Sequence, residues 1–240
     1  MARAVRRKAA KPQTSGSSVP AFGPILARAS KRCGGPAAFE KQLPKPQSDR
    51  ALKSAPDDRY LSLMSLRIFR AGLKHALVDS KWPAFEEAFR GFDLRRIVAM
   101  PDEALEACMK NERLIRHWAK LKSIPANARA MIGIAREHGS FGAYLATWPG
   151  ADTVGLWADL ARRFQQLGGN SGPYFLRMAG KDTFILTEDV VAALIAAGIV
   201  KKKPTGKADL GKVQEAFNAW AAETGRPLSA LSRILALSVG

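Results

Sequence analysis

Apolar residues after position 56 recur at intervals of three and four, the spacing that places them on one face of a helix. The first such series consists of Tyr60, Leu61, Met64, Ile68 and Leu73. No segment alternates apolar and polar residues for long enough to predict a half-buried strand. We therefore predict an all-α domain over residues 54–240.

Glycine, proline and short polar residues divide this domain into helices. A helix is predicted to start at Trp82-Pro83 and to end at Gly91, and another to start near Pro101. Residues 113–150 predict one or two helices stopped by Gly139, then a short helix closed by Pro149-Gly150. Residues 153–167 are amphipathic, and the last two helices are separated at 225–227.

The segment "TEDVVAALIAAGIV" has the features of a helix N-terminus. Thr187 is the expected N-cap, and Glu188 and Asp189 fall in the first turn, where carboxylates favour the positive end of the helix dipole.

A glycine-rich turn separates two helical stretches in "RRFQQLGGNSGPYFLRMAG". Glycines at this turn permit positive φ and close approach of a ligand to the backbone, and Pro173 suits the start of the second helix. The free N–H groups there are suited to a nucleic-acid phosphate. We expect the backbone contacts to come from Gly168, Gly169, Asn170, Ser171 and Gly172. The alternative is an ordinary helical hairpin.

Residues 1–53 differ from the rest in composition. They contain twelve Lys or Arg against two acidic residues, a formal charge of +10, with Pro, Ser, Gly and few large apolar residues. We predict a disordered basic arm with a short helix around 25–32. An organelle transit peptide is the alternative, and we favour the basic arm of a bacterial-type protein.

The net charge of +17 favours a nucleic-acid partner, although solubility alone is the simpler explanation. The two cysteines, Cys33 and Cys108, are far apart, which argues against a disulfide scaffold or a thiolate zinc site and fits a reducing compartment. No apolar run is long enough to span a membrane. We expect a monomer without metal or cofactor, located in the cytoplasm and associated with the nucleoid.

Three segments in consistent order resemble a known family. They are "IFRAGLKHALVDSKWPAFEEAFRGFD", "RLIRHWAKLKSIPANARAMIGIAREHGSFGAYL" and "LGGNSGPYFLRMAG". Together they resemble the DNA-3-methyladenine glycosylase I family of the helix-hairpin-helix DNA glycosylases. The resemblance implies an all-helical, two-lobed enzyme that flips an alkylated purine out of duplex DNA and hydrolyses its N-glycosidic bond.

The resemblance also implies roles for residues near "AGL". Leu73 is the candidate wedge that fills the gap left by the flipped base, with an ordinary core leucine as the alternative. Arg67 takes the place of the family's base-recognition carboxylate, and His75 takes the place of its aromatic residue. Both are candidate base-pocket residues. The family's zinc ligands have no counterparts.

Two carboxylates downstream of the hairpin are the catalytic candidates. In the wider superfamily an Asp after the hairpin stabilises the transition state, and Asp189, with Glu188 beside it, holds a similar place. Helix capping is the alternative role for both. Phosphate contacts are also expected from Lys181, Arg177 and the basic residues of the arm, Arg6, Arg7 and Lys8.

From the sequence and this resemblance we predict a DNA glycosylase that excises alkylated purine of the 3-methyladenine type in base-excision repair. The alternative is a glycosylase-like protein that binds DNA without excising bases, suggested by Arg67 in place of a carboxylate. A basic RNA-binding protein is a third and weaker hypothesis.

Overall fold

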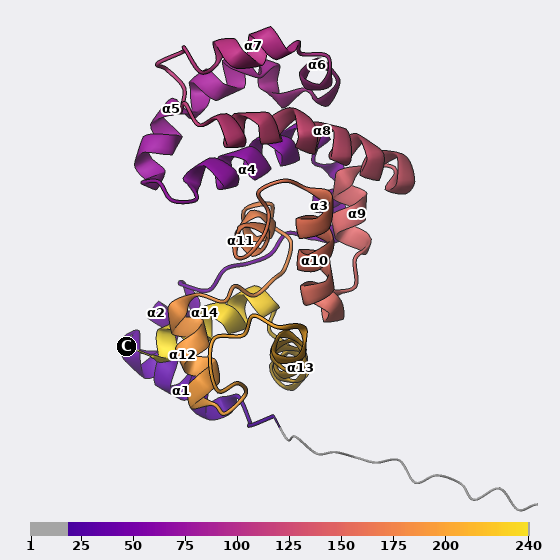
Figure 1. Ribbon diagram of the computed structural model, residues 1–240. Coiled ribbons are helices and arrows are strands. Elements are labelled where there is room, and N and C mark those ends of the chain that lie inside the picture. Colours follow the sequence, from indigo (N-terminus) through magenta and orange to yellow (C-terminus); the bar gives the residue numbers. More distant parts are fainter. Residues whose placement is uncertain (1–18, 240) are drawn as a thin grey trace, which may run out of the picture.

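The computed structural model describes residues 19–239, and residues 1–18 and 240 lie outside the described part of the chain. It is built from helices joined by short connections (Figure 1), and no strand occurs within residues 19–239. The α-helices are α1 Gly23–Arg32, α2 Pro36–Glu40, α3 Asp49–Ser54, α4 Asp57–Arg70, α5 His75–Ala88, α6 Leu94–Val98, α7 Asp102–Ala107, α8 Trp118–His138, α9 Phe141–Thr147, α10 Thr153–Arg163, α11 Ser171–Met178, α12 Glu188–Ala196, α13 Lys207–Thr224 and α14 Leu228–Ser238. Two 3-10 turns, η1 Arg90–Phe92 and η2 Gly150–Asp152, complete the set.

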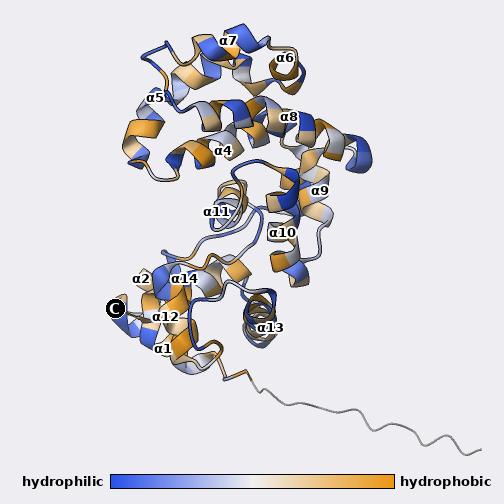
Figure 2. Cartoon of the chain, in the orientation of Figure 1, coloured by the Kyte–Doolittle hydropathy of each residue, from blue (hydrophilic) through white to orange (hydrophobic). Residues whose placement is uncertain are grey.

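The helices form two lobes, each with its own apolar core. The first lobe is centred on α4, α5, α8 and α9, and its core extends to α11. The second lobe consists of α1, α2, α12, α13 and α14. Apolar residues are concentrated on α12 and α14 (Figure 2), and α14 packs against both α12 and α1. Trp157 of α10 packs against both cores. The predicted all-α, two-lobed architecture is confirmed.

The N-terminal segment is part of the second lobe, so the expectation of a disordered arm is wrong for residues 19–53. Phe22 is fully buried, its ring centroid lies 5.2 Å from that of Trp220, and the indole N–H of Trp220 donates to the carbonyl of Pro20 at 2.8 Å. Ile25 and Phe39 are also buried in this core. The few apolar residues of this segment are enough to attach it to the lobe, because α12 to α14 supply the apolar surface against which they pack. The expected arm residues 1–18 lie outside the described residues.

Most predicted helix boundaries agree with the structure, with one clear exception. Gly139 ends α8 with φ of 88°, and Gly225 ends α13 in the left-handed region. Helix α5, in contrast, begins at His75 and continues through Pro83, although Trp82-Pro83 was predicted as its start. The ring of Trp82 stacks on Phe85 and Phe92, and this packing holds the helix together across the proline.

Two chain crossings join the lobes. The segment before α3 meets the segment after α11, where the N–H of Gln47 donates to the carbonyl of Gly180 at 2.9 Å. Gly180 has φ of 85°, and a Cβ there would lie 2.6 Å from Cγ of Gln47, so only glycine fits. Asp182 then accepts the backbone N–H groups of Leu228 and Ser229 at the start of α14. The lobes are thereby fixed to each other close to α11.

None of the helices within residues 19–239 combines the length and the apolar character that a bilayer crossing demands.

Candidate base-binding site

A cavity of about 530 Å³ lies where α4 turns into α5. It is lined by Arg67, Arg70, Ala71, Gly72, Leu73, Lys74, His75 and Tyr174. Seven of these residues belong to the end of α4, the connection 71–74 and the first residue of α5, and Tyr174 comes from α11, which follows the glycine-rich hairpin. The cavity has a size typical of sites for small organic ligands, roughly 300–1,000 Å³. It brings together three residues that the sequence predicts for the base site, namely Arg67, Leu73 and His75.

The turn that forms the rim of this cavity is exposed. Gly72 has φ of 79°, a conformation that favours glycine, and the chain reverses there between the two helices. Leu73 follows with 38% of its surface exposed, and Leu77 one helical turn later is 48% exposed. Leu73 is therefore not a core leucine, and the exposed position suits the predicted wedge. Its role as a wedge stays a prediction.

Arg67 is half-buried and lines the cavity. Its guanidinium carbon lies 4.5 Å from the centroid of the Tyr174 ring, a cation–π distance. Its Nε is buried and has no hydrogen-bond partner among the described residues. Burial lowers the pKa of Arg67, and the neighbouring Arg70 lowers it further. Tyr174 is a site residue that the sequence did not reveal, because nothing local to α11 links it to α4.

Lys120 of α8 binds carbonyl groups at the start of the turn between α4 and α5. The side chain is buried, and its Nζ donates to the carbonyls of Ala71 at 2.6 Å and Phe69 at 3.3 Å. Burial lowers the pKa of Lys120, and the positive charge of Arg67 lowers it further. This lysine satisfies the carbonyls left free at the end of α4. Lys120 therefore positions the backbone segment that carries Leu73 and His75.

The glycine-rich hairpin is present between α10 and α11. Only Gly169 of its three glycines has positive φ, at 57°. Gly172 lies inside α11, and a Cβ there would be 3.1 Å from the carbonyl of Leu167, so close packing explains this glycine. Gly168 and Gly172 do not use the positive φ that glycine permits. Nothing lies within 4 Å of a Cβ added to Gly168 or Gly169, which leaves their backbone accessible.

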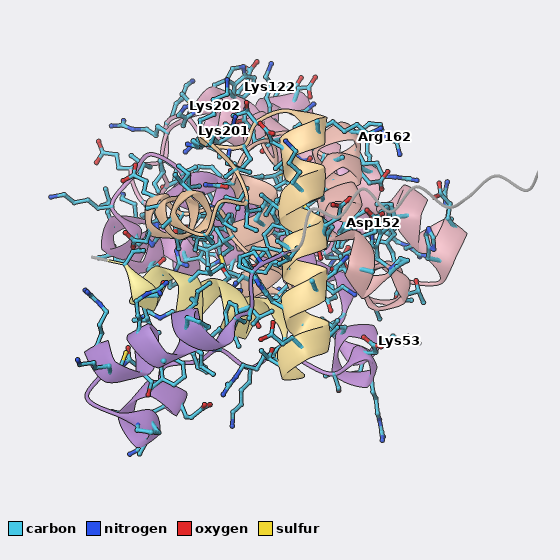
Figure 3. All side chains as sticks on the ribbon, turned by 90° about the horizontal axis from the view of Figure 1, so that it is seen from below. Lys53, Lys122, Asp152, Arg162, Lys201 and Lys202 are labelled. Carbon is cyan, nitrogen blue, oxygen red and sulfur yellow. The ribbon has the colours of Figure 1, made fainter. Side chains whose placement is uncertain are left out.

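A run of lysines that the sequence analysis did not use lies close to the hairpin. Gly169 and Asn170 line a second cavity, of about 470 Å³, together with Lys203 of the loop before α13. Asn170 also donates from Nδ2 to the carbonyl of Leu186 at 3.2 Å, which ties the hairpin to the segment before α12. Lys201 and Lys202 are exposed, and in the view along the direction from one lobe to the other they lie toward the same side as Lys122 of the first lobe (Figure 3). The lysine run was visible in the sequence, but its proximity to the hairpin depends on the tertiary fold.

The expected phosphate contact from Lys181 does not fit its position. Lys181 is only 8% exposed, and its Nζ donates to the carbonyl of Trp148 at 3.1 Å. Burial lowers the pKa of this lysine. Arg177 is similarly committed, because its guanidinium donates to the carbonyl of Thr183 at 2.7 Å. Both cations tie the segment after α11 to its surroundings.

The two catalytic candidates lie away from the cavity lining. Glu188 and Asp189 are exposed in the first turn of α12, in the second lobe, and neither lines the cavity at Arg67. Thr187 is the N-cap, and its hydroxyl accepts the N–H of Val190 at 3.3 Å. This arrangement agrees with the capping role. A catalytic role for Asp189 or Glu188 stays a prediction.

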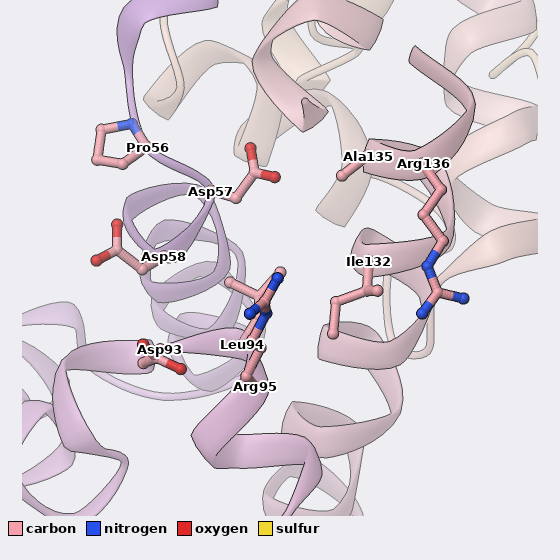
Figure 4. A pocket seen from close by; sticks show the side chains of 9 residues that line it. All are labelled: Pro56, Asp57, Asp58, Asp93, Leu94, Arg95, Ile132, Ala135 and Arg136. Atoms are coloured by element: carbon pink, nitrogen blue, oxygen red, sulfur yellow. The ribbon is translucent and has the colours of Figure 1, made fainter. Parts of the chain in front are cut away.

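A third cavity, of about 540 Å³, lies at the opposite end of α4 (Figure 4). Its lining includes Asp57, Asp58 and Asp93, and two of these carboxylates cap backbone N–H groups. Asp57 accepts the N–H of Phe141 at 2.9 Å, and Asp93 accepts the N–H of Arg96 at 2.9 Å. Burial raises the pKa of Asp57 despite its backbone hydrogen bonds. The cavity is therefore bordered by helix caps, and it lies about 20 Å from the Gly72 turn, the length of a 14-residue helix.

Within the described part of the chain, no three His, Cys, Asp or Glu residues approach each other closely enough to hold a metal ion.

Known structures place this architecture among the DNA glycosylases. The 8-oxoguanine DNA glycosylase of Methanocaldococcus jannaschii is 14% identical, with a TM-score of 0.55 over 88% of this chain and 92% of that one. A mutant of 3-methyladenine DNA glycosylase I from Staphylococcus aureus is 19% identical, with a TM-score of 0.50 over 77% of this chain and 95% of that one. At these identities the similarity defines the fold alone, and the fold is that of an all-α DNA glycosylase.

Sequence comparison finds a related family for part of the chain. Residues 51–162 match the model of the methyladenine glycosylase family, which confirms the resemblance expected from the sequence. The DNA-3-methyladenine glycosylase of Haemophilus influenzae is 40% identical over 67 residues. That alignment spans 28% of this chain and 36% of the relative, so it covers about a third of the relative's length. The segment matching the family model contains Arg67, Leu73, His75 and Lys120, and the cavity-lining Tyr174 lies beyond it.

Proposed function

We propose that this protein is a DNA glycosylase that removes an alkylated purine from duplex DNA as the first step of base-excision repair. The observation that carries the proposal is the cavity at the Gly72 turn, which lies mostly within the segment matching the methyladenine glycosylase family. The cavity lies beside an exposed leucine, so a base-sized space and a side chain able to replace the base are adjacent. Such a pair is what base flipping requires.

The proposed reaction is hydrolysis of the bond between C1′ of the sugar and N9 of the base. The C1′–N9 bond breaks with its electron pair going to the base, the oxygen of water bonds to C1′, and one proton of that water is released. A purine methylated at N3 is cationic in DNA and leaves as a neutral base. Binding and orientation of the flipped base are then the main tasks of the protein, which suits a cavity without a lining carboxylate.

The proposed partner is double-stranded DNA carrying alkylated bases, bound by a monomer. Exposed lysines from both lobes, Lys122 with Lys201 and Lys202, lie toward one side in the view of Figure 3 and supply positive charge for the phosphate backbone. Gly168 and Gly169 offer open backbone for a further phosphate contact. In a bacterial-type cell this activity would take place in the cytoplasm, at the nucleoid. The relatives do not favour the alternative of a DNA-binding protein without base excision.

The test is release of free bases from methylated duplex DNA by the purified protein, measured by chromatography. Release above the rate without protein is expected. Salt-sensitive DNA binding without release of any base would contradict the proposal and support the binding protein instead. Size-exclusion chromatography with light scattering tests the expected monomer.

A further inference from the structure

The Arg67 cavity has an unusual charge pattern for a site that would receive a methylated purine. Of its eight lining residues four are basic or can become so, namely Arg67, Arg70, Lys74 and His75, and none is acidic. Buried Lys120 adds a positive charge close to Arg67. The nearby acid Asp79 is bound to Arg70, with 2.7 Å between its Oδ1 and Nη2 of the arginine. The positive charge of Arg67 is therefore not matched by a carboxylate.

The guanidinium of Arg67 is also held in place while remaining available. Tyr174 covers one face of it at 4.5 Å, which fixes its plane. Its Nε lacks a hydrogen-bond partner among residues 19–239. A buried polar group without a partner is rare and costly, because water no longer reaches it. Arg67 also lines the cavity, so a ligand that enters can accept hydrogen bonds from those guanidinium N–H groups that face the space.

Arginine offers only donors, so it discriminates between purines at C6. Guanine-type bases present the O6 oxygen, with N7 as a second acceptor where it is not methylated, and a guanidinium binds this edge with two hydrogen bonds. Adenine-type bases present an N6 amino group, which is also a donor. Methylation at N3 makes either purine cationic, so repulsion by Arg67 applies to both bases. The C6 group separates them, because Arg67 would face a second donor in 3-methyladenine and an acceptor in 3-methylguanine.

We infer that the cavity selects purines carrying a C6 carbonyl oxygen, and that Arg67 is the residue that reads this oxygen. The inference rests on the proposed glycosylase function and refines its substrate class. Among bases methylated at N3, 3-methylguanine is preferred to 3-methyladenine. Hypoxanthine, which carries O6 and is neutral, is also a substrate.

The experiment compares base release from two substrates. The first is duplex DNA treated with dimethyl sulfate, from which 3-methyladenine, 3-methylguanine and 7-methylguanine are separated by chromatography, with each rate normalised to the amount of that base present. The second is a duplex with a single hypoxanthine. For the unaltered protein we expect 3-methylguanine to be released about tenfold faster than 3-methyladenine, the discrimination typical of one bidentate arginine contact.

Three variants identify the group responsible. Arg67→Glu is expected to reverse the ratio in favour of 3-methyladenine, because a carboxylate accepts from N6 but would meet a second acceptor in the O6 of 3-methylguanine, and Lys120 can pair with it. Arg67→Lys keeps the charge but loses the planar fork, so the ratio should fall severalfold toward unity. Arg129→Glu on the exposed side of α8 makes the same charge change outside the cavity and should leave the ratio unaltered. Circular dichroism verifies that each variant is folded.

The outcomes separate the inference from the proposed function. Release of 3-methyladenine at least as fast as 3-methylguanine, with a ratio that Arg67→Glu leaves unchanged, would overturn the inference while supporting the glycosylase function. Absence of any base release by the unaltered protein and by Arg67→Glu would overturn the glycosylase function itself. A reversed ratio in Arg67→Glu alone, with Arg129→Glu like the unaltered protein, supports both.

Discussion

Asp159 shows how a single buried carboxylate is stabilised in this protein. Its side chain accepts the hydroxyl of Tyr144 at 2.8 Å and pairs with Arg162 and Arg163. Burial raises the pKa of Asp159, but the hydrogen bonds from Tyr144 and Arg162 and the charges of both arginines outweigh it, so the pKa is lowered. Burial and the same contact raise the pKa of Tyr144. The charged form of Asp159 is therefore the one that the fold favours.

This charge predicts a dependence of stability on pH. Because the pKa of Asp159 is lower in the folded state than its ordinary value of 3.8, its contribution is present above that value and is lost as the pH falls through the folded value. At pH 7 the free energy of unfolding of Asp159→Asn should be about 1–3 kcal/mol lower than that of the unaltered protein. This difference should become smaller toward pH 3. Urea unfolding from pH 7 to pH 3 measures this. Asp102→Asn, exposed on α7, is the control. A deficit independent of pH would contradict the assignment.

Lys120 makes a second prediction at the scale of one residue. Lys120→Met removes the donor to the carbonyls of Phe69 and Ala71 and should lower the free energy of unfolding by about 1–3 kcal/mol. It should also reduce base release, since the turn carrying Leu73 loses its support. Thermal unfolding and the base-release assay measure the two effects. Lys122→Met, on the exposed side of the same helix, should alter stability by less than about 0.5 kcal/mol. Equal loss of stability in both variants would count against the positioning role.

For single residues, the roles that depend on residues nearby in the chain could be predicted from the sequence. Thr187 was identified as an N-cap because the N–H it accepts lies three residues away. Leu73, Arg67 and His75 were brought together by one short segment and by the family resemblance. Tyr174 and Lys120 were missed because each contacts the segment around Gly72 from another helix. Lys181 was expected to contact a phosphate because a lysine considered alone is usually exposed, whereas the fold buries it against the carbonyl of Trp148.

Helices show a similar division between local and distant causes. The ends of α8 and α13 could be predicted since Gly139 and Gly225 adopt conformations that favour glycine. The start of α5 could not, because stacking of Trp82 with Phe85 and Phe92 carries the helix through Pro83. The burial of α1 was likewise hidden, as it depends on its packing against α14, nearly two hundred residues later in the chain.

The hairpin between α10 and α11 carries a prediction at the scale of an element. Gly168 has open space around its Cβ position and an ordinary φ, so Gly168→Asp should fold normally. Its negative charge should nevertheless weaken binding to duplex DNA by about tenfold if a phosphate lies there. Fluorescence anisotropy with a labelled duplex measures the affinity. Gly133→Asp on α8, also without close neighbours, is the matched control. Undiminished affinity of a folded Gly168→Asp protein would exclude the hairpin from the DNA interface.

For the whole molecule, the distribution of charge predicts how DNA binding responds to salt. Residues 1–18 contain five Lys or Arg and no acidic residue. Their removal should flatten the plot of log affinity against log salt concentration, by about 0.9 for each phosphate that the shortened protein no longer neutralises. The unfolding midpoint should stay the same, because the described core begins at Phe22. Affinity measured at several salt concentrations, together with urea unfolding, tests both statements.

A longer truncation is the control for that experiment. Removing residues 1–40 also takes away Phe22, Ile25 and Phe39, and it should destabilise the second lobe by several kcal/mol. If removal of residues 1–18 lowered the stability as much as removal of residues 1–40, the basic segment would have a structural role that its charge does not predict.

The placement of α1 against α14 has a consequence for synthesis in the cell. Helices α4 to α11 form their own core and can fold while the ribosome is still adding the later residues. Helix α1 leaves the ribosome before α4 to α11, yet its partner α14 is made after them. The lobe that contains both can be completed only after α14 has emerged, so a nascent chain can carry the Arg67 cavity before it carries the lysine run beside the hairpin.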